Sequence, residues 1–252
     1  MNKQKILDCV KLAKYAYASQ KDIPWEDFNI NHVGWIQDRK TDTQGFVASA
    51  GSDIYIVWRG SESPTDFLKD ASVVKTFAYD CKVHSGFNSC LEAVSLKLYK
   101  LVKQAIQDIG GPYEVSNVYI SGHSLGGALA TLSAVKFAHW YPSMRDRIKV
   151  VTIGSPRVGD RAFRNLFDKH IPESVRIVHD NDIVTRVPKL NYFHVKGQLK
   201  LADNGTVMTN SLNPVKAITR IIKANITADS IKDHSADKYL KAVELWDGTL
   251  SK

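Results

Sequence analysis

The chain alternates between short runs of β-branched and apolar residues and longer stretches in which apolar residues recur at helical spacing. Residues 46–48 and 54–58 predict two strands, and the turn at 51–53 indicates an antiparallel hairpin. Residues 91–109 have helical periodicity and end at a Gly-Gly-Pro stop signal. The other expected elements are a helix over 6–17, a strand over 118–121 with a helix after it, a strand over 148–153, a helix over 161–169, a strand over 175–178 and a helix over 235–246. This order predicts a single α/β domain over residues 1–252, with a mixed, mostly parallel central sheet flanked by helices.

Charge and composition indicate which classes of binding partner to expect. The 252 residues include 34 Lys and Arg against 26 Asp and Glu, a formal net charge of +8. This balance favours anionic partners such as a phospholipid surface or an acidic polymer, and it also serves solubility. No motif or patch typical of nucleic-acid binding is present, so we expect no nucleic-acid partner. No stretch approaches the ~20 apolar residues of a membrane span.

One basic segment, residues 214–223, gathers Val and Ile side chains on one side of a helical wheel and Lys and Arg on another. Such a helix either lies on an anionic membrane surface or buries its apolar stripe in the core. The core interpretation is the more ordinary of the two.

The first residues and the cysteines bear on the compartment. The start of the chain is basic but has no uninterrupted apolar run, which argues against a cleavable secretory signal. We therefore expect a cytoplasmic protein, with signal-independent export or a mature form as alternatives. The three cysteines, Cys9, Cys81 and Cys90, have no metal-binding spacing, and we expect buried free thiols. A Cys81–Cys90 pair is the alternative for an oxidising compartment.

The richest motif is Gly-His-Ser-Leu-Gly at residues 122–126, between an alternating apolar run and a helix of small residues. A nucleophile elbow has this form, because a serine on a strained strand-to-helix turn needs neighbours with almost no side chain. The following helix also directs backbone N–H groups and a positive dipole end toward the serine. The pattern predicts that Ser124 is the nucleophile of a serine hydrolase.

A serine nucleophile needs a histidine base held by a carboxylate, which follow in the order Ser, Asp or Glu, His in elbow-bearing α/β hydrolases. Asp182 comes just after the predicted strand that ends near 178, and spacing alone leaves Asp180 open. His194 lies in a strand-like run typical of a packed histidine. His234 lies in a loop before the final helix, which favours it as the base.

The chain resembles the class 3, fungal-type lipases, a family that includes triacylglycerol lipases, feruloyl esterases and phospholipase A1 enzymes. The resemblance spans roughly residues 50–245 and implies an α/β-hydrolase fold. The matching segments, in the order of the family, are Ile56–Ser61, Asp66–Asp70, Val83–Phe87, Gly122–Ala128, Gly154–Asp160, Asp182–Val184 with Pro188, and Asp233–His234.

The resemblance implies a triad of Ser124, Asp182 and His234. It also implies an oxyanion hole formed by the backbone N–H groups of Ser61 and Leu125, with Asp70 orienting Ser61. His84 and Arg157 match family positions as well, and we interpret both as structural hydrogen-bonding residues.

The chain departs from the family pattern between Ser61 and Val83. Residues 62–82, which correspond to the family's lid, are short, only moderately apolar and free of tryptophan. This favours a small flap, and with it esterase or phospholipase behaviour, over a large interfacial lid.

The sequence thus predicts a carboxylic ester hydrolase that acts on lipid or acyl esters by acyl-enzyme chemistry and needs no metal or organic cofactor. Phospholipase A1 or feruloyl-type esterase activity is the alternative. A catalytically silent relative that uses the pocket for binding is the alternative from another class.

Overall fold

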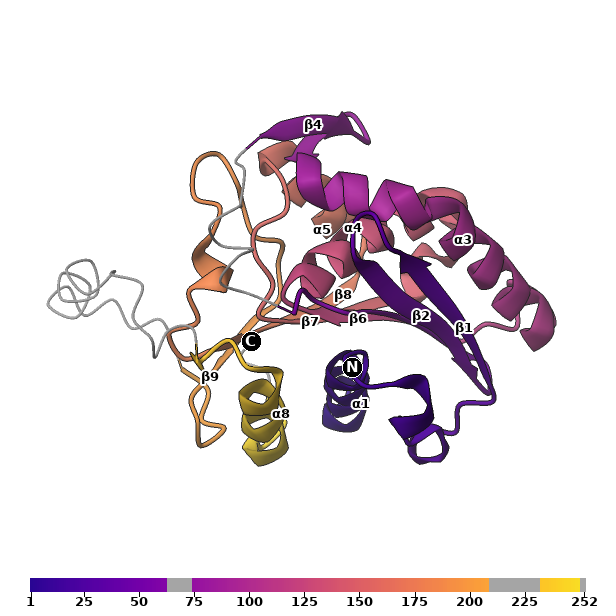
Figure 1. Ribbon diagram of the computed structural model, residues 1–252, viewed down its shortest axis with the longest axis horizontal. Coiled ribbons are helices and arrows are strands. Elements are labelled where there is room, and N and C mark those ends of the chain that lie inside the picture. Colours follow the sequence, from indigo (N-terminus) through magenta and orange to yellow (C-terminus); the bar gives the residue numbers. More distant parts are fainter. Residues whose placement is uncertain (63–73, 209–231, 250–252) are drawn as a thin grey trace, which may run out of the picture.

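A central sheet organises the computed structural model, which describes residues 1–62, 74–208 and 232–249 (Figure 1). Its seven strands lie in the order β1-β2-β3-β6-β7-β8-β9. Their bounds are His32–Asp38 for β1, Thr43–Ala50 for β2, Asp53–Trp58 for β3, Asn117–His123 for β6, Ile148–Ile153 for β7, Glu173–His179 for β8 and Gln198–Leu201 for β9. Strands β4 (Lys75–Ala78) and β5 (Cys81–His84) form a separate hairpin.

The direction of strand pairing changes once across the sheet. β1 to β3 pair antiparallel, and β3, β6, β7, β8 and β9 then pair parallel. The β2–β3 pair confirms the hairpin expected at residues 46–58, with the turn before Asp53 closing it. Parallel strands need crossover connections, and their carboxyl ends meet at one edge, where loops can place functional side chains.

Helices cover both faces of the sheet (Figure 1). One face carries α3 (Ser85–Ile109), α4 (Leu125–Trp140) and α5 (Arg161–His170). The other carries α1 (Lys3–Tyr15) and α8 (Ala236–Leu245), which come from opposite ends of the chain and lie side by side. Each face buries its own apolar cluster, so the sheet separates two cores. Short 3₁₀ turns lie at Gln20–Asp22, Trp25–Phe28, Pro142–Arg147 and Val184–Arg186.

Helix ends follow the sequence signals closely, with some differences. α3 ends before Gly110, whose φ of 110° is the left-handed conformation that glycine adopts at a helix end. α3 begins earlier than expected because His84 accepts a hydrogen bond from the Phe87 N–H and caps the helix. Ser235 occupies the N-cap position of α8, but its side chain makes no capping hydrogen bond. The first helix ends at Tyr15, so Tyr17 lies in the turn beyond it.

Other features of the described residues bear on the earlier expectations. The strands β1, β4, β5 and β9 had no clear signal in the sequence. Residues 192–195 are not a strand, and only Phe193 makes an isolated bridge, to Gly159. All three cysteines are free thiols, with Cys9 and Cys81 buried and Cys90 half-buried. Among the helices described, none has the length and apolar character needed to cross a membrane.

Candidate active site

Ser124 occupies the turn between β6 and α4 in a strained conformation. Its φ of 59° and ψ of −124° are unusual for a residue with a side chain. The Ser124 N–H donates to the Ile153 carbonyl on β7 at 3.0 Å, and the Ser124 carbonyl accepts from the Gly127 N–H at 2.9 Å. The neighbouring strand and the new helix together hold the strain, and they keep the serine at the carboxyl end of β6.

The two glycines of the motif explain how this turn can form. A Cβ atom at Gly122 would lie 2.3 Å from the carbonyl oxygen of Gly126. A Cβ atom at Gly126 would lie 2.3 Å from the carbonyl oxygen of Trp58 on β3. Both distances are far below contact distance to atoms of the backbone. The helix therefore passes so close to β6 and β3 that no side chain fits at either position.

Asp182, in the loop after β8, and His234 meet beside Gly154, the residue after β7. His234 Nδ1 lies 2.8 Å from Asp182 Oδ2, and both side chains are buried. Asp182 also accepts hydrogen bonds from the Tyr239 hydroxyl at 2.6 Å and the Val184 N–H at 2.8 Å. A carboxylate only accepts hydrogen bonds, so Nδ1 carries the hydrogen and Nε2 keeps its lone pair. His234 is therefore held in the tautomer whose Nε2 can accept a proton.

His234 packs against the elbow through the ring of His123. The ring centroid of His234 lies 4.6 Å from that of His123, the residue just before Ser124. Ser124 Oγ and His234 Nε2 are both buried, and neither hydrogen-bonds to another described residue. The hydrogen bond between a serine nucleophile and its histidine is often long or poorly aligned before substrate binds. His234 Nε2 therefore lies in a ring that packs against the elbow, and it has no hydrogen-bond partner among the described residues.

Other acidic and histidine side chains that follow Ser124 in the chain lie elsewhere. Asp180 is half-buried two residues from Asp182, and it is Asp182 that hydrogen-bonds to His234. Asp160 caps α5 by accepting from the Phe163 N–H at 2.9 Å. His179 is buried with its ring beside Tyr239, and its Nε2 lies 3.0 Å from Asp203. His170 ends α5 on the far side of the sheet from α8.

The loop that carries Asp182 is fixed by buried polar side chains. His194 Nε2 donates to the Thr185 carbonyl at 2.6 Å. Burial, with the nearby Arg176, lowers the pKa of His194 to about 3 and so keeps its ring neutral. Arg157 donates to the carbonyls of Arg186 and Pro188. These contacts fit the structural interpretation of His194 and Arg157.

The oxyanion-hole candidates lie at the ends of two elements. Ser61 follows β3 and is half-buried, and Leu125 is the first residue of α4. The first N–H groups of a helix have no acceptor within it, so the Leu125 N–H is available to an anion. Asp70 falls outside the described residues. The oxyanion role of Ser61 and Leu125 stays a prediction from the sequence.

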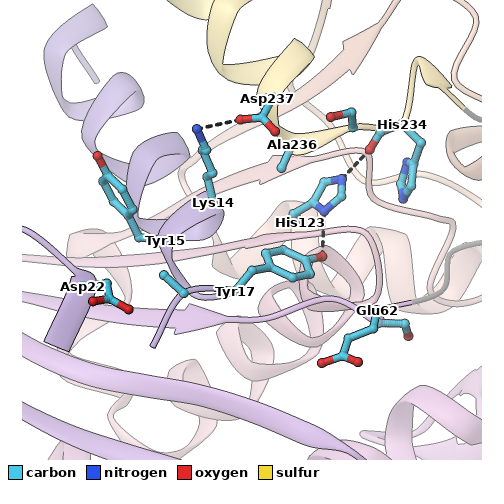
Figure 2. Close-up of a pocket in the computed structure, with 12 residues that line it drawn as sticks. Lys14, Tyr15, Tyr17, Asp22, Glu62, His123, His234, Ala236 and Asp237 are labelled. Carbon is cyan, nitrogen blue, oxygen red and sulfur yellow. Dashed lines mark hydrogen bonds and ion pairs between the residues drawn. The ribbon is translucent and has the colours of Figure 1, made fainter. Parts of the chain in front are cut away.

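A cavity of about 610 Å³ opens beside the base (Figure 2). It lies between the end of α1, the start of α8 and the segment after β3. Its lining residues are Lys14, Tyr15, Tyr17, Ala18, Asp22, Ser61, Glu62, His123, His234, Ser235, Ala236 and Asp237. Lys14 and Asp237 form an ion pair across it at 2.6 Å. In the described residues, no group of three His, Cys, Asp or Glu side chains could hold a metal ion.

Sequence reasoning missed three polar residues at this site. Tyr239 donates to Asp182, and burial together with that carboxylate raises its pKa well above the usual value, which keeps the hydroxyl protonated. Tyr17 and His123 contact each other at 2.8 Å. His123 lies within the elbow motif, but neither tyrosine had a signal beyond the apolar spacing of its helix.

Known proteins resemble this chain in sequence and in fold. The family model described as Lipase (class 3) matches residues 55–192. A lipase of Caenorhabditis elegans is 32% identical over 142 residues, which cover 56% of this chain and 40% of that protein. The chloroplastic phospholipase A(1) DAD1 of Arabidopsis thaliana is 37% identical over 108 residues, covering 42% and 24%. The matched stretches therefore span less than half of either relative.

The fold is shared over nearly the whole chain with a solved structure. The triacylglyceride lipase of Rhizomucor miehei superposes with a TM-score of 0.73 at 26% identity, covering 92% of both chains. This likeness confirms the α/β-hydrolase fold predicted from the sequence. The family model covers more than half of the 252 residues, and the resemblance noted from the motifs is thereby confirmed. The chain belongs to the class 3 lipases.

Proposed function

We propose that this chain hydrolyses carboxylic esters of lipids, with Ser124 as the nucleophile, His234 as the general base and Asp182 as the partner of the base. The observation that carries the proposal is the buried Asp182–His234 pair, 2.8 Å apart, whose histidine ring lies 4.6 Å from that of His123 in the elbow and keeps Nε2 without a hydrogen-bond partner among the described residues. A histidine hydrogen-bonded to a buried carboxylate beside a strained serine has a direct use in nucleophilic catalysis.

The chemistry follows from the positions of these groups. His234 Nε2 removes the Ser124 hydroxyl proton while Oγ forms a bond to the ester carbonyl carbon. The Ser61 and Leu125 N–H groups stabilise the oxyanion, and each such donor is worth roughly 3–4 kcal/mol. The protonated His234 then gives its proton to the leaving alcohol as the C–O bond breaks. Water repeats the sequence on the acyl-enzyme and releases the acid.

The class of ester is supported by the relatives and by charge. The relatives are named as lipases or as a phospholipase A(1), so a lipid ester is the proposed substrate and phospholipid the second candidate. The net charge of +8 supports contact with an anionic lipid surface. The basic segment 214–223, which the sequence suggested for that contact, falls outside the described residues. A cytoplasmic location stays a prediction.

The lid expectation rests on residues 62–82, of which Glu62 and residues 74–82 are described. Residues 75–84 form the β4–β5 hairpin, and Phe77 is 75% exposed on it. A small flap in place of a large lid would leave activity on dissolved short-chain esters intact. Activity on dissolved short-chain esters therefore tests the flap interpretation of this chain.

The first experiment combines active-site labelling with a substrate series. We expect a fluorophosphonate probe to label the wild-type chain and to leave Ser124→Ala unlabelled. p-Nitrophenyl esters from acetate to palmitate are then assayed with and without anionic phospholipid vesicles, with Ser124→Ala as the blank. Labelling that persists in Ser124→Ala would refute the nucleophile assignment. Labelling without hydrolysis of any ester would favour the binding-protein alternative.

A further inference from the structure

We propose that Tyr17 and His123 form a hydrogen-bonded bridge that positions His234 for catalysis and ties it to the segment bearing the oxyanion-hole candidate Ser61. This inference rests on the proposed function of Ser124 and His234. Neither the family match, which begins at residue 55, nor the elbow motif assigns a role to Tyr17.

Two hydrogen bonds make up the bridge (Figure 2). The Tyr17 hydroxyl lies 2.8 Å from His123 Nδ1, and His123 Nε2 lies 2.7 Å from the backbone carbonyl oxygen of His234. Because a carbonyl only accepts, Nε2 carries the hydrogen, and Nδ1 of a neutral ring then accepts from the tyrosine. One tautomer of His123 satisfies both contacts. The bridge therefore has a fixed direction from Tyr17 to His234.

The His123 ring is buried and neutral. It is 3% exposed, and burial together with the neighbouring His234 holds the pKa of His123 well below its ordinary value. His234 must take up a proton during catalysis, with its ring centroid only 4.6 Å from that of His123. A charged His123 would repel that proton, so a neutral ring fixed by Tyr17 favours the charged state of the base.

The Tyr17 hydroxyl also touches the segment after β3. A Cβ atom at Gly60 would lie 2.2 Å from this hydroxyl, so the glycine allows the close approach. Burial raises the pKa of Tyr17, and the nearby Gly60 backbone partly offsets that rise. Gly60 directly precedes Ser61. The Tyr17 hydroxyl therefore contacts both the residue before Ser61 and His123, which hydrogen-bonds to His234.

In its described part, the loop that carries His234 is also held by an ion pair between Asp233 and Lys238 at 2.7 Å. Ser235 is the N-cap of α8 but its side chain accepts no hydrogen bond from the helix. The Ser235 N–H makes only a turn contact with the Lys232 carbonyl at 3.2 Å. The His123 contact pins this loop at the residue whose ring performs the chemistry, and a shift of about 1 Å there is enough to cost on the order of 100-fold in rate.

The test compares single substitutions with a matched control, using p-nitrophenyl butyrate as a dissolved substrate. We expect Tyr17→Phe to lower kcat about 10-fold with KM changed less than about twofold, since one hydrogen bond is lost. His123→Leu should lower kcat about 100-fold. His123→Gln, whose amide can still donate to the His234 carbonyl, should recover part of that loss. Tyr113→Phe, which alters an exposed tyrosine outside the cavity, should match the wild type.

The pH profile and the His123 tautomer separate positioning from general stability. Without the Tyr17 hydroxyl, Nδ1 accepts a proton more easily, so the acidic limb of kcat/KM should move to higher pH in Tyr17→Phe. NMR of labelled histidine should find His123 neutral at pH 6 with the hydrogen on Nε2.

The inference would be overturned if the wild type is active and the Tyr17→Phe variant has the same kcat and the same pH profile. A hydrogen on Nδ1 of His123 would also overturn the inference, whether or not the chain hydrolyses esters. A wild type inactive on every ester with the bridge intact by NMR would instead count against the proposed function and against a catalytic role for the bridge.

Discussion

The two faces of the sheet support the site in different ways. The face covered by α3, α4 and α5 packs large side chains such as Trp58 and Phe137, and nearly every residue of α4 is buried. The face covered by α1 and α8 is built from the two ends of the chain and includes Tyr239 and Trp246. The first face carries the elbow at Ser124. The second carries His234 and the residues that orient it.

The difference concerns how each group is fixed. Ser124 is held by contacts within its own strand–turn–helix unit and by the adjacent strand, so its geometry comes with folding of the core. His234 is held by a hydrogen bond from its ring to Asp182, which Tyr239 fixes in turn, and by the hydrogen bond that its backbone carbonyl accepts from His123. These contacts can be removed one at a time. Substitutions on the α4 face should therefore damage folding, and substitutions around His234 should damage catalysis in a folded protein.

The largest expected effect is on the His234 side, from Asp182→Asn. The amide can donate to Nδ1 and so favours the wrong tautomer of His234. We expect kcat to fall about 10⁴-fold, as in other triads that lose this carboxylate. The circular dichroism spectrum of the variant should match that of the wild type. Asp180→Asn is the control and should keep near wild-type activity. If Asp180→Asn is inactive and Asp182→Asn is active, Asp180 is the carboxylate that holds His234.

A smaller but still severe effect is expected at the elbow, from Gly122→Ala. The added Cβ would meet backbone atoms of Gly126 at 2.3–2.4 Å, so the helix or strand must shift. We expect a loss of about 3 kcal/mol or more in the free energy of unfolding, measured by urea denaturation. Gly51→Ala has an open surrounding at φ 57° and should lose only about 1 kcal/mol. Equal losses would contradict the packing argument.

The smallest expected effect concerns pH and the loop that holds Asp182. The pKa of His194 is about 3 in the folded chain and near 6.5 when unfolded, so the unfolded state binds more protons between these values. Stability from this group is complete above pH 6.5 and falls as the pH is lowered toward 3. His194→Gln removes the titration and keeps a donor for Thr185.

Urea denaturation at pH 6.5 and pH 5.0 measures this effect. We expect the His194→Gln variant to lose about 1–2 kcal/mol less between the two values than the wild type does. Identical losses in the two proteins would show that His194 does not contribute to the acid sensitivity.

Much of the fold and part of the site were open to prediction from the sequence. Residues 46–58, 148–153 and 175–178 alternate or run apolar, and they became β2, β3, β7 and β8. β1 and β9 were missed because their burial patterns are irregular, with exposed and half-buried positions at the edges of the sheet. Edge strands lack the two-sided burial that gives central strands a clear pattern.

The amino-acid sequence by itself determined the elbow. A strand, two glycines and a small-residue helix are adjacent in the chain, so local sterics alone place Ser124 on a strained turn. It left Asp180 and Asp182 unresolved, and it gave no role to Tyr17, His123 or Tyr239. The tertiary structure decided these, because the contacts of Tyr17 and His234 with His123 join residues 106 and 111 positions apart. Such contacts depend on how two sheet faces and both chain ends pack, which no local pattern records.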